Sequence, residues 1–150
     1  MSDDSRLNRL QDCVEAVHDA SMRIFSEANR DANSDYRQRL ASVGEAWRDF
    51  VAGSREARHA DFADATASLL ARIGDDLFYG RGAADEAIAA YDLALAIAPR
   101  HEESLKGIIA AYLQGSDRRP ERALPYAERL AAIDPRRERD VVYISSLIQR

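Results

Sequence analysis

Hydrophobic and polar residues follow a helical period along almost the whole chain. Large apolar side chains recur every three or four residues, which gathers them on one face of an α-helix, and no segment alternates as a half-buried strand does. Glycines, prolines and short polar runs divide this pattern into seven segments. We expect helices at about 7–28, 34–53, 57–79, 84–98, 102–114, 120–133 and 138–148. The pattern therefore predicts an all-α fold.

The first two predicted helices carry matching apolar stripes, over residues 7–28 and 36–50. A polar run separates them, in which Asn33 or Ser34 would cap the second helix. Two such helices joined by a short turn are expected to form an antiparallel hairpin that folds onto the rest of the chain. The alternative is a homodimer through these N-terminal helices, as a coiled coil. Its stripe offers only about three to four heptads, and Ser21 interrupts them.

The stripes also predict where individual side chains lie. Trp47 falls on the second stripe and is expected to be buried between the first and third helices. The last helix is expected to lie on the helix before it and to cover its apolar face. The third helix presents Phe62, Thr66, Leu69, Ile73 and Leu77, and the last helix presents Val141, Ile144, Leu147 and Ile148.

An internal repeat is the strongest signal in the sequence. When the chain is compared with itself at an offset of about 36 residues, apolar, small and proline positions coincide in two successive helix pairs. In each pair a small residue lets two helices approach closely, and a proline ends the second helix. The coincident positions are Leu69 and Leu105, Ile73 and Ile109, Leu77 and Leu113, Ala87 and Ala123, Ile97 and Ile133, and Pro99 and Pro135.

This layout resembles the tetratricopeptide repeat family. Its small, large, small and proline positions fall on Ala87, Tyr91, Ala94 and Pro99. The resemblance implies a right-handed α-solenoid of helical pairs within residues 57–150, preceded by an N-terminal helical hairpin at 1–56. The two repeats are expected at about 66–99 and 102–135, and a C-terminal capping helix at 138–149.

The resemblance also implies a function. The family binds partner proteins or peptides, as a scaffold or adaptor, in a groove lined by the first helix of each pair. Positions on those helices are therefore expected to contact the partner. The alternative is a cytoplasmic chaperone for a secreted client protein. The groove candidates are Arg72, Asp75, Phe78 and Tyr79 in the first unit, and Lys106 and Gln114 in the second.

Charge and cysteine content narrow the classes of partner. The chain has 26 acidic and 21 basic residues, a net charge of -5, and both signs are interspersed. Only the basic cluster at 136–139 approaches the concentrated face that binds nucleic acid, and Glu138 interrupts it. The apolar runs are too short to cross a bilayer, and the N-terminus is acidic. With Cys13 as the only cysteine, we expect a cytoplasmic protein that binds neither nucleic acid nor membrane.

No arrangement of residues indicates catalysis. The three histidines, at 18, 59 and 101, are scattered without the spacing of metal ligands. Asp75 and Asp76 are adjacent on a helix, so their carboxylates point in different directions and do not form an acid–base pair. The Gly80-Arg81-Gly82 segment follows no strand and does not indicate a phosphate-binding loop. We therefore expect a binding protein without enzymatic activity, metal or cofactor.

Overall fold

The computed structural model describes residues 3–24, 30–115 and 117–149, and most of these residues are helical while none forms a strand. The predicted all-α fold is thus confirmed. No helix among the described residues is both long enough and apolar enough to cross a membrane. The helices are α1 (Asp3–Ser21), α2 (Arg30–Gly53), α3 (Glu56–Asp75), α4 (Ala84–Ile97), α5 (Glu102–Gln114), α6 (Pro120–Ile133) and α7 (Glu138–Ile148), with a π-helical turn η1 (Asp76–Gly80) and a 3-10 turn η2 (Pro135–Arg137).

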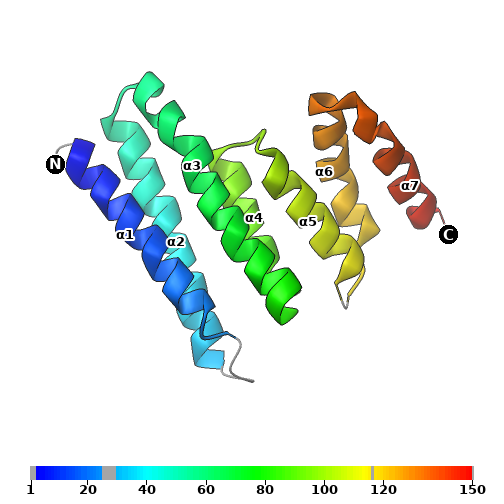
Figure 1. Ribbon diagram of the computed structural model, residues 1–150, viewed down its shortest axis with the longest axis horizontal. Coiled ribbons are helices and arrows are strands. Elements are labelled where there is room, and N and C mark those ends of the chain that lie inside the picture. Colours follow the sequence, from blue (N-terminus) through cyan, green and yellow to red (C-terminus); the bar gives the residue numbers. More distant parts are fainter. Residues whose placement is uncertain (1–2, 25–29, 116, 150) are drawn as a thin grey trace.

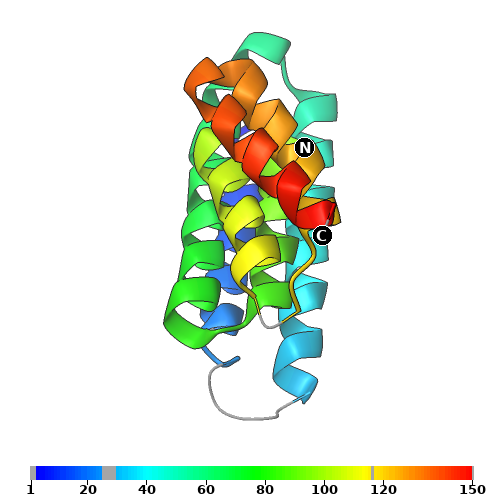
Figure 2. The same cartoon turned by 90° about the vertical axis from the view of Figure 1, so that its right-hand side faces the viewer.

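The helices pack in sequence order as antiparallel neighbours. α1 lies along α2, α3 along α4 and α5 along α6, and α7 packs on α6. In Figure 1, α1 and α3 lie side by side in front of α2 and α4, with the first and last helices at opposite ends of the row. Figure 2 shows α7 lying across α6. One apolar core runs through these helices and includes Ile144 of α7, which is buried.

The N-terminal stripes pack against each other within the chain. Leu10 and Val17 of α1, and Val43 and Phe50 of α2, are buried in the same core. The hairpin expected from the sequence is therefore formed. Because burial against α2 consumes the α1 stripe, this stripe is not available as the seam of a dimeric coiled coil.

The start and end of the first loop differ from the prediction. α1 ends at Ser21 instead of near Ala28, which lies outside the described residues. The last carbonyl of α1 accepts a hydrogen bond from Arg81, at 2.8 Å, so a distant residue satisfies this helix end. α2 starts at Arg30, which places Asn33 inside the helix, where its amide donates to Glu86 Oε1 at 3.3 Å. The prediction that Asn33 or Ser34 caps α2 is therefore wrong.

Three predicted core positions are more exposed than their stripes suggest. Leu69 is 46% exposed, whereas its neighbour Leu70 is fully buried, so the match of Leu69 with buried Leu105 is wrong. Trp47 is only half-buried and faces α4 and His59 instead of the space between α1 and α3. Ile148 on α7 is 42% exposed. In each case the helix was predicted correctly, but its neighbours cover a different arc of its surface.

Tyr91 of α4 fills the space between α3 and α5. A Cβ atom added at Gly74 of α3 would lie 2.7 Å from the Tyr91 ring, and one added at Gly107 of α5 would lie closer still. Only glycine lets both helices approach the ring this closely. The Tyr91 hydroxyl donates to Asp75 Oδ1 at 2.5 Å. A large residue on one helix thus packs between glycines on its two neighbours, which holds α3, α4 and α5 together.

Candidate partner-binding groove

A groove runs between α1 and α3, with a cavity of about 410 Å³. Each helix contributes one face, because the lining residues on both recur at helical spacing. The two helices run in the same direction, so residues early in α1 lie opposite residues early in α3 (Figure 1). The lining residues are Leu7, Leu10, Gln11, Val14, Glu15 and His18 of α1, Phe62, Ala65, Thr66, Leu69, Arg72 and Ile73 of α3, and Asp76 of η1.

The groove has an apolar floor and a polar rim. Leu10, Val14 and Ile73 are buried at its base, where they also belong to the core of the molecule. Leu69 stands on the wall, and nearly half of its side chain is open to solvent. A concave apolar surface bordered by a few polar groups is typical of a binding site.

Charged side chains on the rim lack partners within the described part of the chain. Glu15 of α1, Arg72 of α3 and Asp76 of η1 are all exposed, and the side chain of none of them makes a hydrogen bond or an ion pair with another described residue. Arg72 and Asp76 are four residues apart and therefore lie one helical turn from each other. The rim thus offers one positive and two negative groups to a molecule that enters the groove.

The predicted contact residues of α3 and η1 fall into two groups. Arg72 lines the groove between α1 and α3. Asp75 instead accepts the hydrogen bond from Tyr91 and is half-buried. Phe78 packs against the core, while Tyr79 is 64% exposed and lies against Phe78 with ring centroids 4.8 Å apart. Asp75, Phe78 and Tyr79 are absent from the lining of the α1–α3 groove.

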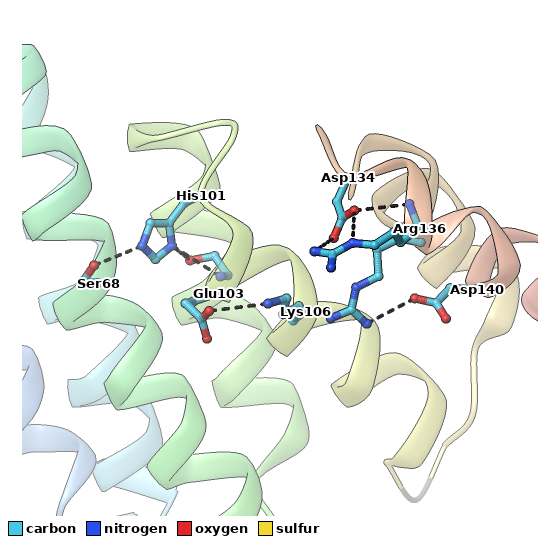
Figure 3. Close-up of polar contacts among 9 residues, drawn as sticks. Ser68, His101, Glu103, Lys106, Asp134, Arg136 and Asp140 are labelled. Carbon is cyan, nitrogen blue, oxygen red and sulfur yellow. Dashed lines mark hydrogen bonds and ion pairs between the residues drawn. The ribbon is translucent and has the colours of Figure 1, made fainter. Parts of the chain in front are cut away.

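The predicted contact residues of α5 lie away from this groove. Lys106 Nζ is 3.6 Å from Glu103 Oε1 on its own helix, as Figure 3 shows. Gln114 lines a smaller cavity of about 320 Å³ beside Tyr143 and Leu147 of α7. The six predicted residues therefore do not form one site, and only Arg72 belongs to the groove described above.

Sequence reasoning missed most of the groove because it assigned the groove wall to the core. Leu69 was placed on a buried stripe, and Gln11, Glu15 and His18 of α1 were not considered as contacts. Their spacing contained a usable signal, since Gln11, Glu15 and His18 recur every three or four residues beside the apolar stripe. The polar side of α1 that faces α3 is decided by how the α1–α2 hairpin packs on the α3–α4 hairpin.

The ionisation of the tyrosines near α3 reflects the packing of this region. Burial, followed by the hydrogen bond and charge of Asp75, raises the pKa of Tyr91 far above its usual value. Burial and the Asp75 charge also raise the pKa of Tyr79. Both phenols therefore stay protonated at neutral pH. No group of three or more potential metal ligands gathers in the described residues.

The chain was compared with known proteins at three levels. No protein-family model matches it, and no curated protein or solved structure is significantly similar to it. The resemblance to the tetratricopeptide repeat therefore stays a prediction that rests on the residues of this chain.

Proposed function

We propose that this chain is a protein-binding module, a scaffold or adaptor, and that a segment of its partner occupies the α1–α3 groove. The observation that carries the proposal is the combination of an apolar floor, the exposed Leu69 and rim charges that have no partner among the residues that the structure describes. Groups of this kind gain most when another molecule removes the apolar surface from water and supplies the missing charges.

The proposed architecture is a right-handed α-solenoid of tetratricopeptide-like pairs. Three successive hairpins, α1–α2, α3–α4 and α5–α6, support it, together with the contacts of α5 with both helices of the preceding pair. The position of Tyr91 between Gly74 and Gly107 supports it further, because it joins a large residue to small ones on the neighbouring helices. In this architecture the first helices of successive pairs line one face, which is where the groove lies.

The dimensions and charges of the groove favour a helical occupant. From Leu7 to His18 the α1 wall spans twelve residues, or about 16 Å, which matches roughly three turns of a bound helix. Such a helix would place apolar side chains at intervals of three and four residues on the floor. It would carry an acidic residue opposite Arg72, and basic residues opposite Glu15 and Asp76.

A displayed library of helical peptides tests this proposal directly. Peptides selected on the wild-type chain should share the apolar spacing and the complementary charges. Their Kd should rise at least tenfold for Leu69→Glu and for Arg72→Glu, because both side chains are exposed and their replacement leaves the core intact. Replacing the acidic peptide residue with lysine should restore binding to the Arg72→Glu variant.

Matched variants outside the groove provide the control. Val142→Glu and Arg139→Glu make the same chemical changes at exposed positions of α7, and we expect the Kd to stay within about twofold. Selected peptides whose affinity is insensitive to both groove variants would contradict the proposed site. A selection that yields no peptide tighter than about 100 µM would contradict helical-segment binding itself.

A further inference from the structure

A second apolar depression lies on the opposite side of the molecule, between α2 and α4. Two cavities, of about 440 and 390 Å³, share Leu93 and Ala96 and therefore form one continuous furrow. We call this surface the α2–α4 furrow. It is lined by Arg37, Leu40, Ala41, Gly44, Trp47, Arg48, Val51 and Ala52 of α2, and by Asp85, Ile88, Ala89, Asp92, Leu93, Ala96 and Ile97 of α4.

The composition of α4 is unusual for a helix with an open face. Among its 14 residues only Asp85, Glu86 and Asp92 are charged. Ile88 and Leu93 are only half-covered in the furrow, and Ala96 is exposed. A helix that is apolar on nearly all sides is normally buried on all sides. The described residues leave this side of α4 uncovered.

Trp47 of α2 points to contact with another molecule, whereas Gly44 is buried beside Arg48 and Leu93 of its own chain. Gly44 lies in the middle of α2, where glycine costs about 1 kcal/mol relative to alanine. A Cβ added there would meet Leu93 and Arg48 at 3.5 Å, an ordinary contact, so packing within the chain does not require the glycine. Trp47 stands at one end of the furrow with its ring only half-buried. Half-buried tryptophans are frequent anchors of protein interfaces.

The α2 wall of the furrow carries basic side chains and the α4 wall carries acidic ones, at the same levels along the helix axes. Arg37 donates to the Asp85 carbonyl at 3.2 Å, which places these residues level with each other. The Arg48 side chain folds back, so that its Nη1 lies beside Gly44, which in turn lies beside Leu93. The basic groups of α2 thus lie level with Asp85 and Asp92 on α4, and all four side chains are exposed. Each carboxylate also has one partner within the chain, since Arg119 lies 3.0 Å from Asp85 Oδ1 and the Tyr126 hydroxyl donates to Asp92 Oδ1 at 3.4 Å.

We propose that the α2–α4 furrow is the interface of a homodimer with its two-fold axis parallel to these helices. This axis places α2 of one copy over α4 of the other at equal height. Arg37 then faces the second copy's Asp85, and Arg48 faces its Asp92. Because the interface is isologous, each ion pair forms twice, and the apolar floors cover each other. The inference is independent of the proposed groove, which lies on the other side of the molecule.

Cysteine cross-linking tests the arrangement of the two copies. In a Cys13→Ser background, Ala41→Cys and Ala89→Cys are made as separate variants. Ala41 and Ala89 lie in the same part of the furrow, three and four residues before Gly44 and Leu93. With the proposed axis, position 41 of one copy faces position 89 of the other. Oxidation should therefore yield at least tenfold more covalent dimer from the mixture than from either variant alone.

Charge exchange tests the energetics. By light scattering over a concentration series, the wild-type chain should reach twice its mass of 16.7 kDa. Arg48→Glu and Asp92→Arg should each raise the dimer Kd at least tenfold, and the double variant should return it to within threefold of the wild type. Arg139→Glu and Glu128→Arg, which change exposed residues outside the furrow, should leave the Kd unchanged.

Three outcomes would overturn the proposal. The first is a wild-type chain that stays monomeric at about 0.5 mM, a concentration at which even a weak specific dimer forms. The second is a dimer whose Kd is insensitive to both single charge variants. The third is efficient cross-linking of the Ala41→Cys variant alone, which would place α2 over α2 and exclude the proposed axis. Each outcome leaves peptide binding in the α1–α3 groove unaffected, so the two proposals fail separately.

Discussion

The two junctions between successive helix pairs differ in how completely they close. Where α3–α4 meets α5, α5 packs against both helices, and Tyr91 fills the space between Gly74 and Gly107. We call this the closed junction. Where α1–α2 meets α3–α4, the contacts run mainly from α1 to α3 and from α2 to α4. We call this the open junction, because it leaves the α1–α3 groove on one side and the α2–α4 furrow on the other.

The difference shows that the two open depressions arise from incomplete packing between similar units. At the closed junction, close backbone approach lets side chains of three helices interdigitate, so little apolar surface stays open. At the open junction, Leu69 and Trp47 stay partly exposed beside the two depressions. The same hairpin unit therefore supplies stability at one junction and, in the proposed function, a recognition surface at the other.

The largest expected difference separates two adjacent leucines of α3. Leu70 is fully buried, whereas Leu69 lines the open junction. Leu70→Ala should lower the free energy of unfolding by about 3 to 4 kcal/mol, because it leaves a cavity in the core. Leu69→Ala should lower it by less than about 1 kcal/mol. Urea denaturation followed by circular dichroism measures both, and equal losses would contradict the distinction between the junctions.

The glycines of the two junctions should respond in opposite directions to alanine. At Gly107 a Cβ overlaps the Tyr91 ring, so Gly107→Ala should cost about 1 to 3 kcal/mol. At Gly44 a Cβ meets only ordinary contacts, so Gly44→Ala should gain about 0.5 to 1 kcal/mol from helix propensity. Unfolding is measured at a low micromolar protein concentration, so that the variants and the wild type are compared as monomers. A loss at Gly44 would show that the open junction is also tightly packed.

Alkaline pH should weaken both junctions through their buried tyrosines. Burial raises the pKa of Tyr36, which bonds the Glu86 carbonyl at the open junction, and of Tyr91 at the closed one. Above pH 10 the unfolded phenols lose a proton that the folded ones retain, so stability falls as pH rises. Each buried tyrosine should contribute about 1.4 kcal/mol per pH unit. Unfolding between pH 9 and 11 should show a shallower decline for Tyr36→Phe and for Tyr91→Phe.

A smaller effect is expected at His101, which links α3 to α5 in the closed junction. Its Nδ1 accepts from the Ser104 amide at 3.3 Å and caps α5, and its Nε2 lies 3.0 Å from the Ser68 hydroxyl (Figure 3). His101→Ala should cost about 1 kcal/mol. His101→Asn keeps a capping side chain and should recover most of that loss in thermal unfolding. An asparagine variant as unstable as the alanine variant would show that the contact with Ser68 matters more than the cap.

The sequence predicted the helices well wherever their ends are set locally. α5, α6 and α7 match their predicted ranges because caps, glycines and prolines within a few residues define where each begins and ends. α1 was predicted too long, and its last carbonyl is bound by Arg81, a contact sixty residues away that the local pattern does not reveal. The sequence pattern shows that Ser21 interrupts the apolar stripe, but it does not predict that the helix ends there.

The sequence by itself determined that the chain is all-helical, that α1 and α2 have matching stripes, and that α4 and α6 are related by an offset of 36 residues. These properties follow from helical periodicity, which depends only on neighbours along the chain. Tertiary structure alone decided that Leu70 is buried and Leu69 exposed, and that Arg72 joins Glu15 on the rim of a groove. A stripe marks the buried side of a helix only to within about one residue, or 100° of rotation. The docking of distant helices selects the arc that remains open, and with it the candidate binding surfaces.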